Sequence, residues 1–382
     1  MANLDLYPSV KHLHAAAKKK LPKFSLDYVE GGSGLEVGLK RNRDALDATT
    51  ITPKYINEWP LLDTEVNLFG RKFSLPFGIA PMGLASLQWP KAELIFAEAA
   101  KNANIPVGLS TSCTVAIEEF GAVASGHGWF QLYPPQDEEI NDDLLGRAER
   151  SGLEVLMVTV DVPARGWRPR DMYNGLSLPP RVTAASLYHA ACRPRWSLAT
   201  LTSGIPHFKT MGRYSKNKSF RGMADFIRQE LGKPVTRERL KHIRNKWKGP
   251  LVVKGIMHPA DAEDAVKMGY DGILVSNHGG RQLDACLSPV EVLADIITQV
   301  DGRATIMVDS GFSNGLDITR GIALGADFVF CGRAFMWGVS VLGRKGPEHV
   351  INLLSNELQL ALTQIGCPSV NELNTSWLNT KT

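Results

Sequence analysis

Cysteine is scarce in this chain of 382 residues, and its five copies are scattered. They form no CxxC pair and no run with the spacing of zinc ligands. An odd number of distant thiols does not build a disulfide framework, so we expect a reducing compartment and no metal site. The five are Cys113, Cys192, Cys286, Cys331 and Cys367.

Long apolar runs are also missing, and none reaches the ~18 residues that a membrane span requires. The first twenty residues lack an apolar h-region, so a secretory signal is not expected, and nearby acidic residues disfavour a mitochondrial one. Basic and acidic residues nearly balance, 43 against 39, which does not indicate a nucleic-acid partner. With 44% hydrophobic residues, the chain has enough apolar side chains for a large core.

Eight short apolar runs alternate with helix-like stretches, a pattern typical of a parallel sheet covered on both faces. Residues 92–103 and 288–300 are the clearest helices, and Ser288 with Pro289 resembles an N-cap and first turn. Eight strand–helix units favour a closed (β/α)8 TIM barrel, with an open doubly wound sheet as the alternative. The expected strands are 77–80, 106–109, 129–132, 155–159, 251–253, 272–276, 305–309 and 328–331.

We expect a single domain over residues 1–382, with the barrel at about 75–345. The first 70 residues are predicted to form a helical cap in front of the barrel. A long loop interrupts the barrel after the fourth strand, and its basic part covers about 172–224. A loop of that length in a compact domain is usually functional or mobile.

Polar residues gather where the predicted strands end, which is where barrel enzymes place their active sites. Lys254 would point into the barrel mouth, either towards a flavin or towards an acidic partner at the rim. The turns 309–311 and 331–333 contain glycines after the seventh and eighth strands, positions that frequently bind phosphate. Arg333 adds a cation to that site.

His278 is the candidate base, because it follows a strand, precedes two glycines and has an imidazole suited to proton transfer. Asp161 is predicted to orient His278 and to stabilise its protonated form. Arg281 and Arg168 supply cations for a carboxylate, and two phenols, Tyr28 and Tyr133, supply donors to a substrate oxygen.

With this set of motifs, the chain resembles the FMN-dependent 2-hydroxy acid dehydrogenase and oxidase family. That family includes glycolate oxidase, L-lactate dehydrogenase and (S)-mandelate dehydrogenase, and the last two look most similar. The resemblance runs from about residue 5 to residue 375, and its most specific motif is SNHGGRQLD at 276–284. Supporting motifs are LPKFSLDY (21–28), WFQLY (129–133), TVDVPARGWRPRD (159–171), LVVKG (251–255), DSGF (309–312) and LGAD…CGRA (324–334).

The resemblance implies the cofactor FMN and a role for each matching residue. His278 would be the base coupled to Asp161, while Arg281, Arg168, Tyr28 and Tyr133 would bind the substrate. Lys254 would lie beside flavin N1. Contacts to the isoalloxazine or ribityl chain would come from Pro81, Met82, Gly83, Ser110, Gln131, Thr159 and Ser276. The ribityl and phosphate groups would be held by Asp309, Gly311, Gly332 and Arg333.

Three positions depart from the family pattern. Ser313 stands where the family commonly has an arginine near the phosphate, which leaves more of that charge to Arg333. Gly83 and Ser112 are smaller than in glycolate-type enzymes, so we expect a bulky or aromatic (S)-2-hydroxy acid such as mandelate. Arg165 either faces solvent or binds a second polar group of the substrate.

The basic insertion at 172–224 carries eight basic residues and no Asp or Glu. Apolar residues alternate with these charges, as an interfacial membrane segment requires. The membrane-associated lactate and mandelate dehydrogenases look similar here and pass electrons to quinone. A solvated lid or a subunit contact is the alternative. The basic residues are Arg181, Arg193, Arg195, Lys209, Arg213, Lys216, Lys218 and Arg221, and the apolar ones are Leu176, Leu178, Leu187, Tyr188, Trp196, Leu198, Leu201 and Phe208.

These observations predict a dehydrogenase at the cytoplasmic face of the cell membrane, with a quinone-like acceptor and, by family analogy, a homotetramer. An oxidase that releases hydrogen peroxide is a close alternative. A non-redox FMN isomerase is disfavoured by the His278–Arg281 pair. A catalytically silent binding module is disfavoured by the complete set of site residues.

Overall fold

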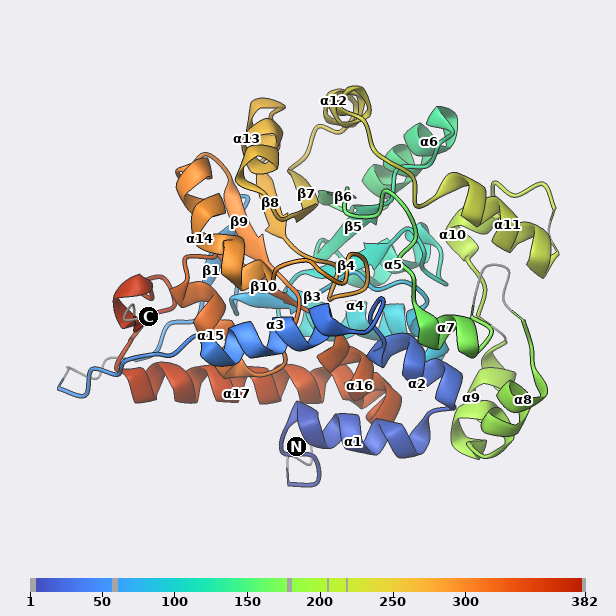
Figure 1. Ribbon diagram of the computed structural model, residues 1–382, viewed down its shortest axis with the longest axis horizontal. Helices are drawn as coiled ribbons and strands as arrows, with labels where there is room; N and C mark the ends of the chain where they lie inside the picture. The colour runs from blue at the N-terminus through green and yellow to red at the C-terminus, as the bar shows by residue number, and fades with distance from the viewer. Residues whose placement is uncertain (1–4, 57–60, 177–180, 205, 218, 380–382) are drawn as a thin grey trace.

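The computed structural model describes residues 5–56, 61–176, 181–204, 206–217 and 219–379. Eight parallel strands close into a barrel in which β10 pairs with β3 and the others follow in chain order (Figure 1). The (β/α)8 prediction is therefore confirmed, and the open doubly wound sheet is wrong. The strands are β3 (Phe77–Ile79), β4 (Val107–Ser110), β5 (Gly128–Leu132), β6 (Val155–Thr159), β7 (Leu251–Ile256), β8 (Gly272–Val275), β9 (Thr305–Val308) and β10 (Phe328–Cys331).

Bulky side chains fill the barrel interior. The rings of Trp129 on β5 and Phe330 on β10 lie 5.4 Å apart, although two strands separate these positions around the barrel. Phe328 packs edge-on to Phe330 at 5.2 Å. Both strands are buried along their whole length, as expected for a parallel sheet covered by helices.

The amino-terminal ends of the barrel strands are covered by a short hairpin that the sequence pattern did not reveal. Its strands are β1 (Val66–Leu68) and β2 (Arg71–Phe73), and they pair antiparallel. Phe69 and Gly70 form the two-residue turn, both with positive φ, as in hairpin turns of this length. The Phe69 ring lies 5.8 Å from Trp129, so the turn closes this end of the barrel.

Three helices precede that hairpin, as the predicted cap required: α1 (Val10–Lys20), α2 (Lys23–Glu30) and α3 (Val37–Ala48). Helix α3 lies over the opposite end of the barrel, where Asn42 exchanges two side-chain hydrogen bonds with Asn277, at 3.0 and 2.7 Å. The residues between α2 and α3, including Gly31, form a glycine-rich turn.

The outer layer consists of helices that alternate with the strands (Figure 1). The two helices predicted most clearly are α4 and α14, and Ser288 is the N-cap of α14 with Pro289 in its first turn. No helix in the described ranges is both long and apolar enough to cross a bilayer. The layer comprises α4 (Ala92–Asn102), α5 (Ile117–Ala124), α6 (Glu138–Arg150), α12 (Arg237–Lys246), α13 (Pro259–Lys267), α14 (Pro289–Val300), α15 (Gly315–Ala323), α16 (Arg333–Leu342) and α17 (Gly346–Ile365).

The segment between β6 and α12 was expected as a long loop, but it is largely helical. Its helices α8 and α9 pack together beside the barrel, at the lower right of Figure 1. Leu178 and Lys218 lie outside the described residues. The helices are α7 (Pro169–Tyr173), α8 (Ala184–Ala191), α9 (Pro194–Ser203), α10 (Lys209–Gly212) and α11 (Phe220–Glu230).

Trp196 packs this insertion against the rest of the protein. Its side chain is buried, and its indole N–H donates to the carbonyl oxygen of Leu87 at 3.0 Å. Its ring packs edge-on to Phe24 at 5.5 Å. Trp196 was expected among residues facing a membrane, so this part of the expectation is wrong. That residues 1–382 act as one domain stays a prediction.

The packed interior predicts a large cost for losing one ring. Phe330 is 1% exposed, so Phe330→Ala leaves a cavity beside Trp129 and should lower the free energy of unfolding by about 3–5 kcal/mol. Leu360→Ala on α17, where the side chain is 57% exposed, is the control and should change it by less than about 0.5 kcal/mol. Urea denaturation of the two variants measures both values, and similar midpoints would contradict a packed barrel interior.

Candidate active site at the carboxyl ends of the strands

His278 lies at the barrel mouth between two predicted partners. Its Nδ1 is 3.0 and 3.1 Å from the two carboxylate oxygens of Asp161, and its Nε2 is 3.1 Å from the hydroxyl oxygen of Tyr133. A carboxylate only accepts hydrogen bonds, so the proton belongs on Nδ1 and Nε2 keeps its lone pair. The imidazole therefore presents a basic nitrogen towards Tyr133.

The backbone brings these groups together through two unusual conformations. His278 has φ of +59°, and its own N–H donates to Ser276 Oγ at 3.1 Å. Gly255 has φ of +101° beside a shift of register between Lys254 and Ile256. A Cβ atom on Gly255 would lie 2.5 Å from Cβ and Cγ of Asp161, so only glycine leaves room for this carboxylate.

Two arginines surround Tyr28 at the same mouth. Arg281 donates to the carbonyl oxygens of Tyr28 and Gly31 at 2.6 and 2.8 Å, and its guanidinium lies 5.1 Å from the centre of the Tyr28 ring. Arg168 lies 5.9 Å from the same ring and pairs with Asp171 at 3.2 Å. Desolvation lowers the pKa of Arg281, and the charge of Arg168 lowers it further. An anion between these cations would relieve that repulsion.

Both phenols stay protonated at neutral pH. Desolvation raises the pKa of Tyr133, and the charge of Asp161 adds to this effect. Desolvation also raises the pKa of Tyr28, although Arg281 and Arg168 oppose it. The Tyr28 hydroxyl donates to the carbonyl oxygen of Gly83 at 3.1 Å, so it lies against the turn after β3.

Small residues form the wall next to Tyr28. A Cβ atom on Gly83 would lie 3.2 Å from Ser112 Cβ and 3.7 Å from the Tyr28 hydroxyl oxygen. A single added methyl group would therefore occupy space that adjoins both residues.

A chain of buried polar side chains crosses the mouth from β4 to β9. Ser110 donates to Gln131 Oε1 at 2.8 Å, and Gln131 Nε2 donates to Thr159 Oγ1 at 2.8 Å. Lys254 donates to Ser276 Oγ at 2.9 Å and forms an ion pair with Asp309. Burial raises the pKa of Asp309, but the charge of Lys254 and the hydrogen bonds from Lys254, Ser276 and Ser310 together leave that pKa below its usual range. The acidic partner that the sequence left open for Lys254 is Asp309, which was itself predicted as a residue of this site.

The turns after β9 and β10 form an anion site. Gly311 has φ of +99°, Gly332 is the N-cap of α16, and within the described ranges neither backbone N–H has a protein acceptor. Arg333 donates to three carbonyl oxygens, those of Val29, Gly279 and Gly31, at 2.8 to 3.3 Å. Desolvation lowers the pKa of Arg333 to about 9, with the charge of Arg281 as a second cause, so the guanidinium is still positively charged at neutral pH. Free N–H groups at a helix N-terminus beside such a cation suit a phosphate group.

The sequence model of a family described as FMN-dependent dehydrogenase matches residues 17–380. The chain belongs to this family. L-lactate dehydrogenase of Vibrio cholerae serotype O1 (strain M66-2) is 38% identical over 367 residues, 94% of this chain and 96% of that protein. (S)-mandelate dehydrogenase of Pseudomonas putida is 35% identical over 370 residues, 97% of this chain and 93% of that protein. A crystal structure described as the monotopic membrane protein (S)-mandelate dehydrogenase has a TM-score of 0.93 at 34% identity, covering 98% of this chain and 99% of that chain.

This FMN-dependent dehydrogenase has a mouth that fits its cofactor. The unpaired N–H groups of Gly311 and Gly332, with the guanidinium of Arg333, match a phosphate. The buried polar side chains of Gln131, Thr159 and Lys254 offer donors and acceptors to a ribityl group and a flavin ring. Pro81 and Met82 border this region, since a Cβ on Gly332 would lie 3.5 Å from Met82 Sδ and one on Gly108 2.7 Å from Pro81.

Sequence reasoning missed several residues that shape this site. Ser310 has φ of +80°, donates to Asp309 at 2.8 Å and accepts from the Gly279 N–H at 2.9 Å. Ser313 is turned towards Asp317, which accepts from its N–H at 3.0 Å and its hydroxyl at 3.2 Å. Asp317 is fully buried and also pairs with Arg43 and Arg320. The sequence offered one signal for Asp317: it is an acid in the first turn of the helix that follows the predicted phosphate turn at 309–311.

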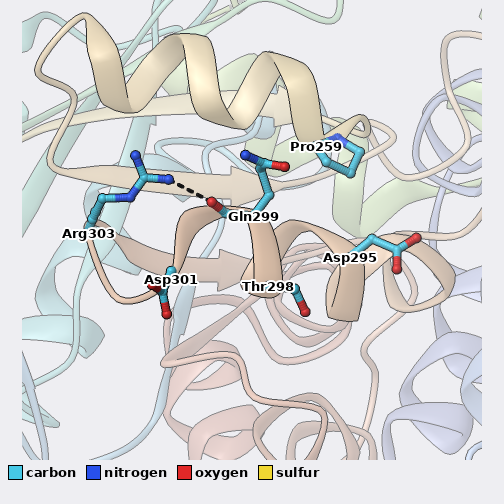
Figure 2. A pocket seen from close by; sticks show the side chains of 6 residues that line it. All are labelled: Pro259, Asp295, Thr298, Gln299, Asp301 and Arg303. Carbon is cyan, nitrogen blue, oxygen red and sulfur yellow. Dashed lines mark hydrogen bonds between the residues drawn. The ribbon is translucent and has the colours of Figure 1, made fainter.

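A shallow groove of about 500 Å³ lies elsewhere, on the outer helical layer. Figure 2 shows it along α14, where Arg303 donates to the carbonyl oxygen of Gln299. None of the predicted site residues lines it. Its lining residues are Pro259, Asp295, Thr298, Gln299, Asp301 and Arg303.

The Asp161–His278 contact predicts a strong effect of a nearly isosteric change. Asp161→Asn removes the charge that stabilises a protonated imidazole, so kcat should fall by about 100-fold or more. Asp295→Asn, in the groove of Figure 2, is the matched control and should retain full activity. Steady-state kinetics with an artificial electron acceptor measures both, with bound FMN checked by absorbance. A fall of less than about threefold would contradict a role for Asp161.

Proposed function

We propose that this dehydrogenase oxidises an (S)-2-hydroxy acid, bulky or aromatic like mandelate, to the 2-oxo acid and passes the electrons to a quinone-like acceptor. The observation that carries the proposal is His278, whose Nε2 lies beside the Tyr133 hydroxyl in a mouth that also contains Arg281 and Arg168. A base beside two cations suits a substrate that has both an acidic proton to lose and a carboxylate.

Each side chain has a distinct part in this proposal. His278 Nε2 accepts a proton from the substrate, and Asp161 stabilises the imidazolium that forms. Arg281 and Arg168 bind the carboxylate, while the protonated phenols of Tyr28 and Tyr133 donate to substrate oxygens. FMN, when bound, accepts the two electrons that leave the substrate.

We assign the cofactor contacts by the same geometry. Lys254 would place its charge beside flavin N1, where it favours an electron-rich ring. The phosphate would bind at the anion site, with Ser313 turned to Asp317 rather than to the phosphate. The flavin ring and ribityl chain would contact Pro81, Met82, Gly83, Ser110, Gln131, Thr159, Ser276 and Asp309, and the phosphate Gly311, Gly332 and Arg333.

The choice of a bulky substrate rests on the wall formed by Gly83 and Ser112. Their small side chains leave space beside the Tyr28 hydroxyl, which an alanine at position 83 would narrow. The similarity to (S)-mandelate dehydrogenase of Pseudomonas putida supports the same choice.

Substrate size can be tested with a single methyl group. Gly83→Ala should lower kcat/KM for (S)-mandelate about tenfold while leaving kcat/KM for glycolate within about twofold, because only the larger substrate needs that space.

Anaerobic absorbance titration of the native enzyme with (S)- and (R)-mandelate, (S)-lactate and glycolate measures which substrate reduces the flavin. Slow recovery of the flavin in air supports a dehydrogenase, and fast recovery with peroxide identifies an oxidase. A native preference for glycolate would contradict the bulky substrate.

We propose further that the insertion rests on the cytoplasmic face of the cell membrane, and that four copies assemble by family analogy. Helices α8 and α9 expose apolar side chains, although Arg193 and Arg195 each donate to a carbonyl oxygen of the protein itself. The similar structure named as a monotopic membrane protein supports the membrane contact. The exposed residues are Leu187, Tyr188, Leu198 and Leu201.

Acidic side chains introduced on this surface should release the protein from a membrane. The double variant Leu198→Glu, Leu201→Glu changes side chains that are 65% and 74% exposed, so folding is preserved. Each leucine contributes roughly 1.5–3 kcal/mol when fully buried, and binding to phosphatidylglycerol vesicles should fall at least about tenfold. Leu360→Glu on α17 is the control. Equal cosedimentation of both variants and the native protein would rule out this surface.

A further inference from the structure

Arg165 stands at the rim of the active site, on the loop between Asp161 and Arg168. The residue is partly exposed at this rim, while its side chain lies against the junction of α11 and α12, which shields the guanidinium from water. A Cβ atom on Gly232 would lie 3.5 Å from Arg165 Cγ, and Arg165 Nη2 is 3.5 Å from the carbonyl oxygen of Ile227. This single contact is at the limit of a hydrogen bond, so it uses little of the guanidinium's capacity.

The junction of α11 and α12 lies next to the loop that carries Tyr133. The N–H of Gln136 donates to the Glu230 carbonyl oxygen at 3.1 Å, and that of Asp137 to Glu230 Oε2 at 3.0 Å. Arg165 belongs to the loop that follows β6, and its contact with this junction brings it near the loop that follows β5. The first loop carries Tyr133 and the second carries Asp161, the two partners of His278.

The charge of Arg165 is not balanced by a neighbour. Across the described ranges, Arg165 forms no ion pair, whereas Arg168 pairs with Asp171 and Arg228 with Asp225, each at 3.2 Å. The insertion beside it contains no acid over 172–224. Desolvation lowers the pKa of Arg165, and the charges of Arg168 and Arg228 lower it further. Arg165, Arg168 and Arg228 therefore act on one another electrostatically, and of these three only Arg165 lacks a carboxylate partner among the described residues.

We propose that Arg165 binds a second anionic group on the substrate, at the end remote from the 2-hydroxy carboxylate. The substrate class is then a 2-hydroxy acid whose tail carries a carboxylate or a comparable anion. This inference rests on the proposed function, in which Arg281 and Arg168 hold the first carboxylate. The body of the substrate would lie beside Gly83 and Tyr28, and its far end would reach the rim at Arg165.

Matched pairs of substrates test this proposal. We would compare (S)-mandelate with its 4-carboxy derivative, and (S)-2-hydroxyhexanoate with (S)-2-hydroxyadipate, in the native enzyme and in Arg165→Gln. The native enzyme should favour at least one dianion about five- to tenfold in kcat/KM, a range that allows for screening at an exposed site. Arg165→Gln should abolish that preference and leave the monoanions within about twofold. Arg228→Gln, whose cation already has a carboxylate partner, is the control and should keep the preference.

Equal kcat/KM for both members of both pairs in the native enzyme would overturn the proposal. So would an equal loss on monoanion and dianion in Arg165→Gln, because that result indicates a structural role. Binding of the corresponding 2-oxo acids, followed by flavin absorbance, separates this question from turnover. A dianion preference in binding that depends on Arg165, without oxidation of any substrate, would keep the anion site and reject the proposed function.

Discussion

Pairing of β10 with β3 is the constraint on which the rest of the structure depends. It closes the sheet, so that the carboxyl ends of eight strands surround one mouth. Four different strands carry or precede Asp161, Lys254, His278 and Arg333, which meet only because of this closure. In an open sheet the loops after the first and last strands would lie at opposite edges, and the phosphate turns would be separated from the flavin side of the site.

Charge within that mouth is organised in two ways. Lys254 and Asp309 neutralise one another in a buried position, and each also contacts a serine hydroxyl. Arg281 and Arg333 instead donate to backbone carbonyl oxygens, which satisfy their N–H groups but leave their charge. The first arrangement pairs a buried cation with an acid, whereas the second leaves positive charge at the mouth, where it favours anions.

The sequence allowed the barrel and its eight strands to be predicted, because continuous apolar runs that alternate with helices are typical of a parallel sheet buried on both faces. Residues at strand ends, such as His278 and Asp161, followed from that order. Features that depend on a few residues or on distant contacts did not follow. The hairpin around Phe69 has strands of three residues, and the need for Gly255 arises only from the approach of Asp161. The burial of Trp196 depends on Leu87, 109 positions away along the chain.

The hairpin turn at Phe69 closes one end of the barrel, which leaves the mouth at the other end as its opening. Because the rings of Phe69, Trp129 and Phe330 fill the barrel near this end, no ligand enters from there. Cofactor and substrate must then use the same entrance, and the one that binds deeper has to enter first and leave last. Helix α3, joined to the rim by Asn42 and Asn277, covers part of this entrance. A cofactor held below the substrate would then leave only from an empty substrate site, whereas substrate and product would exchange above it.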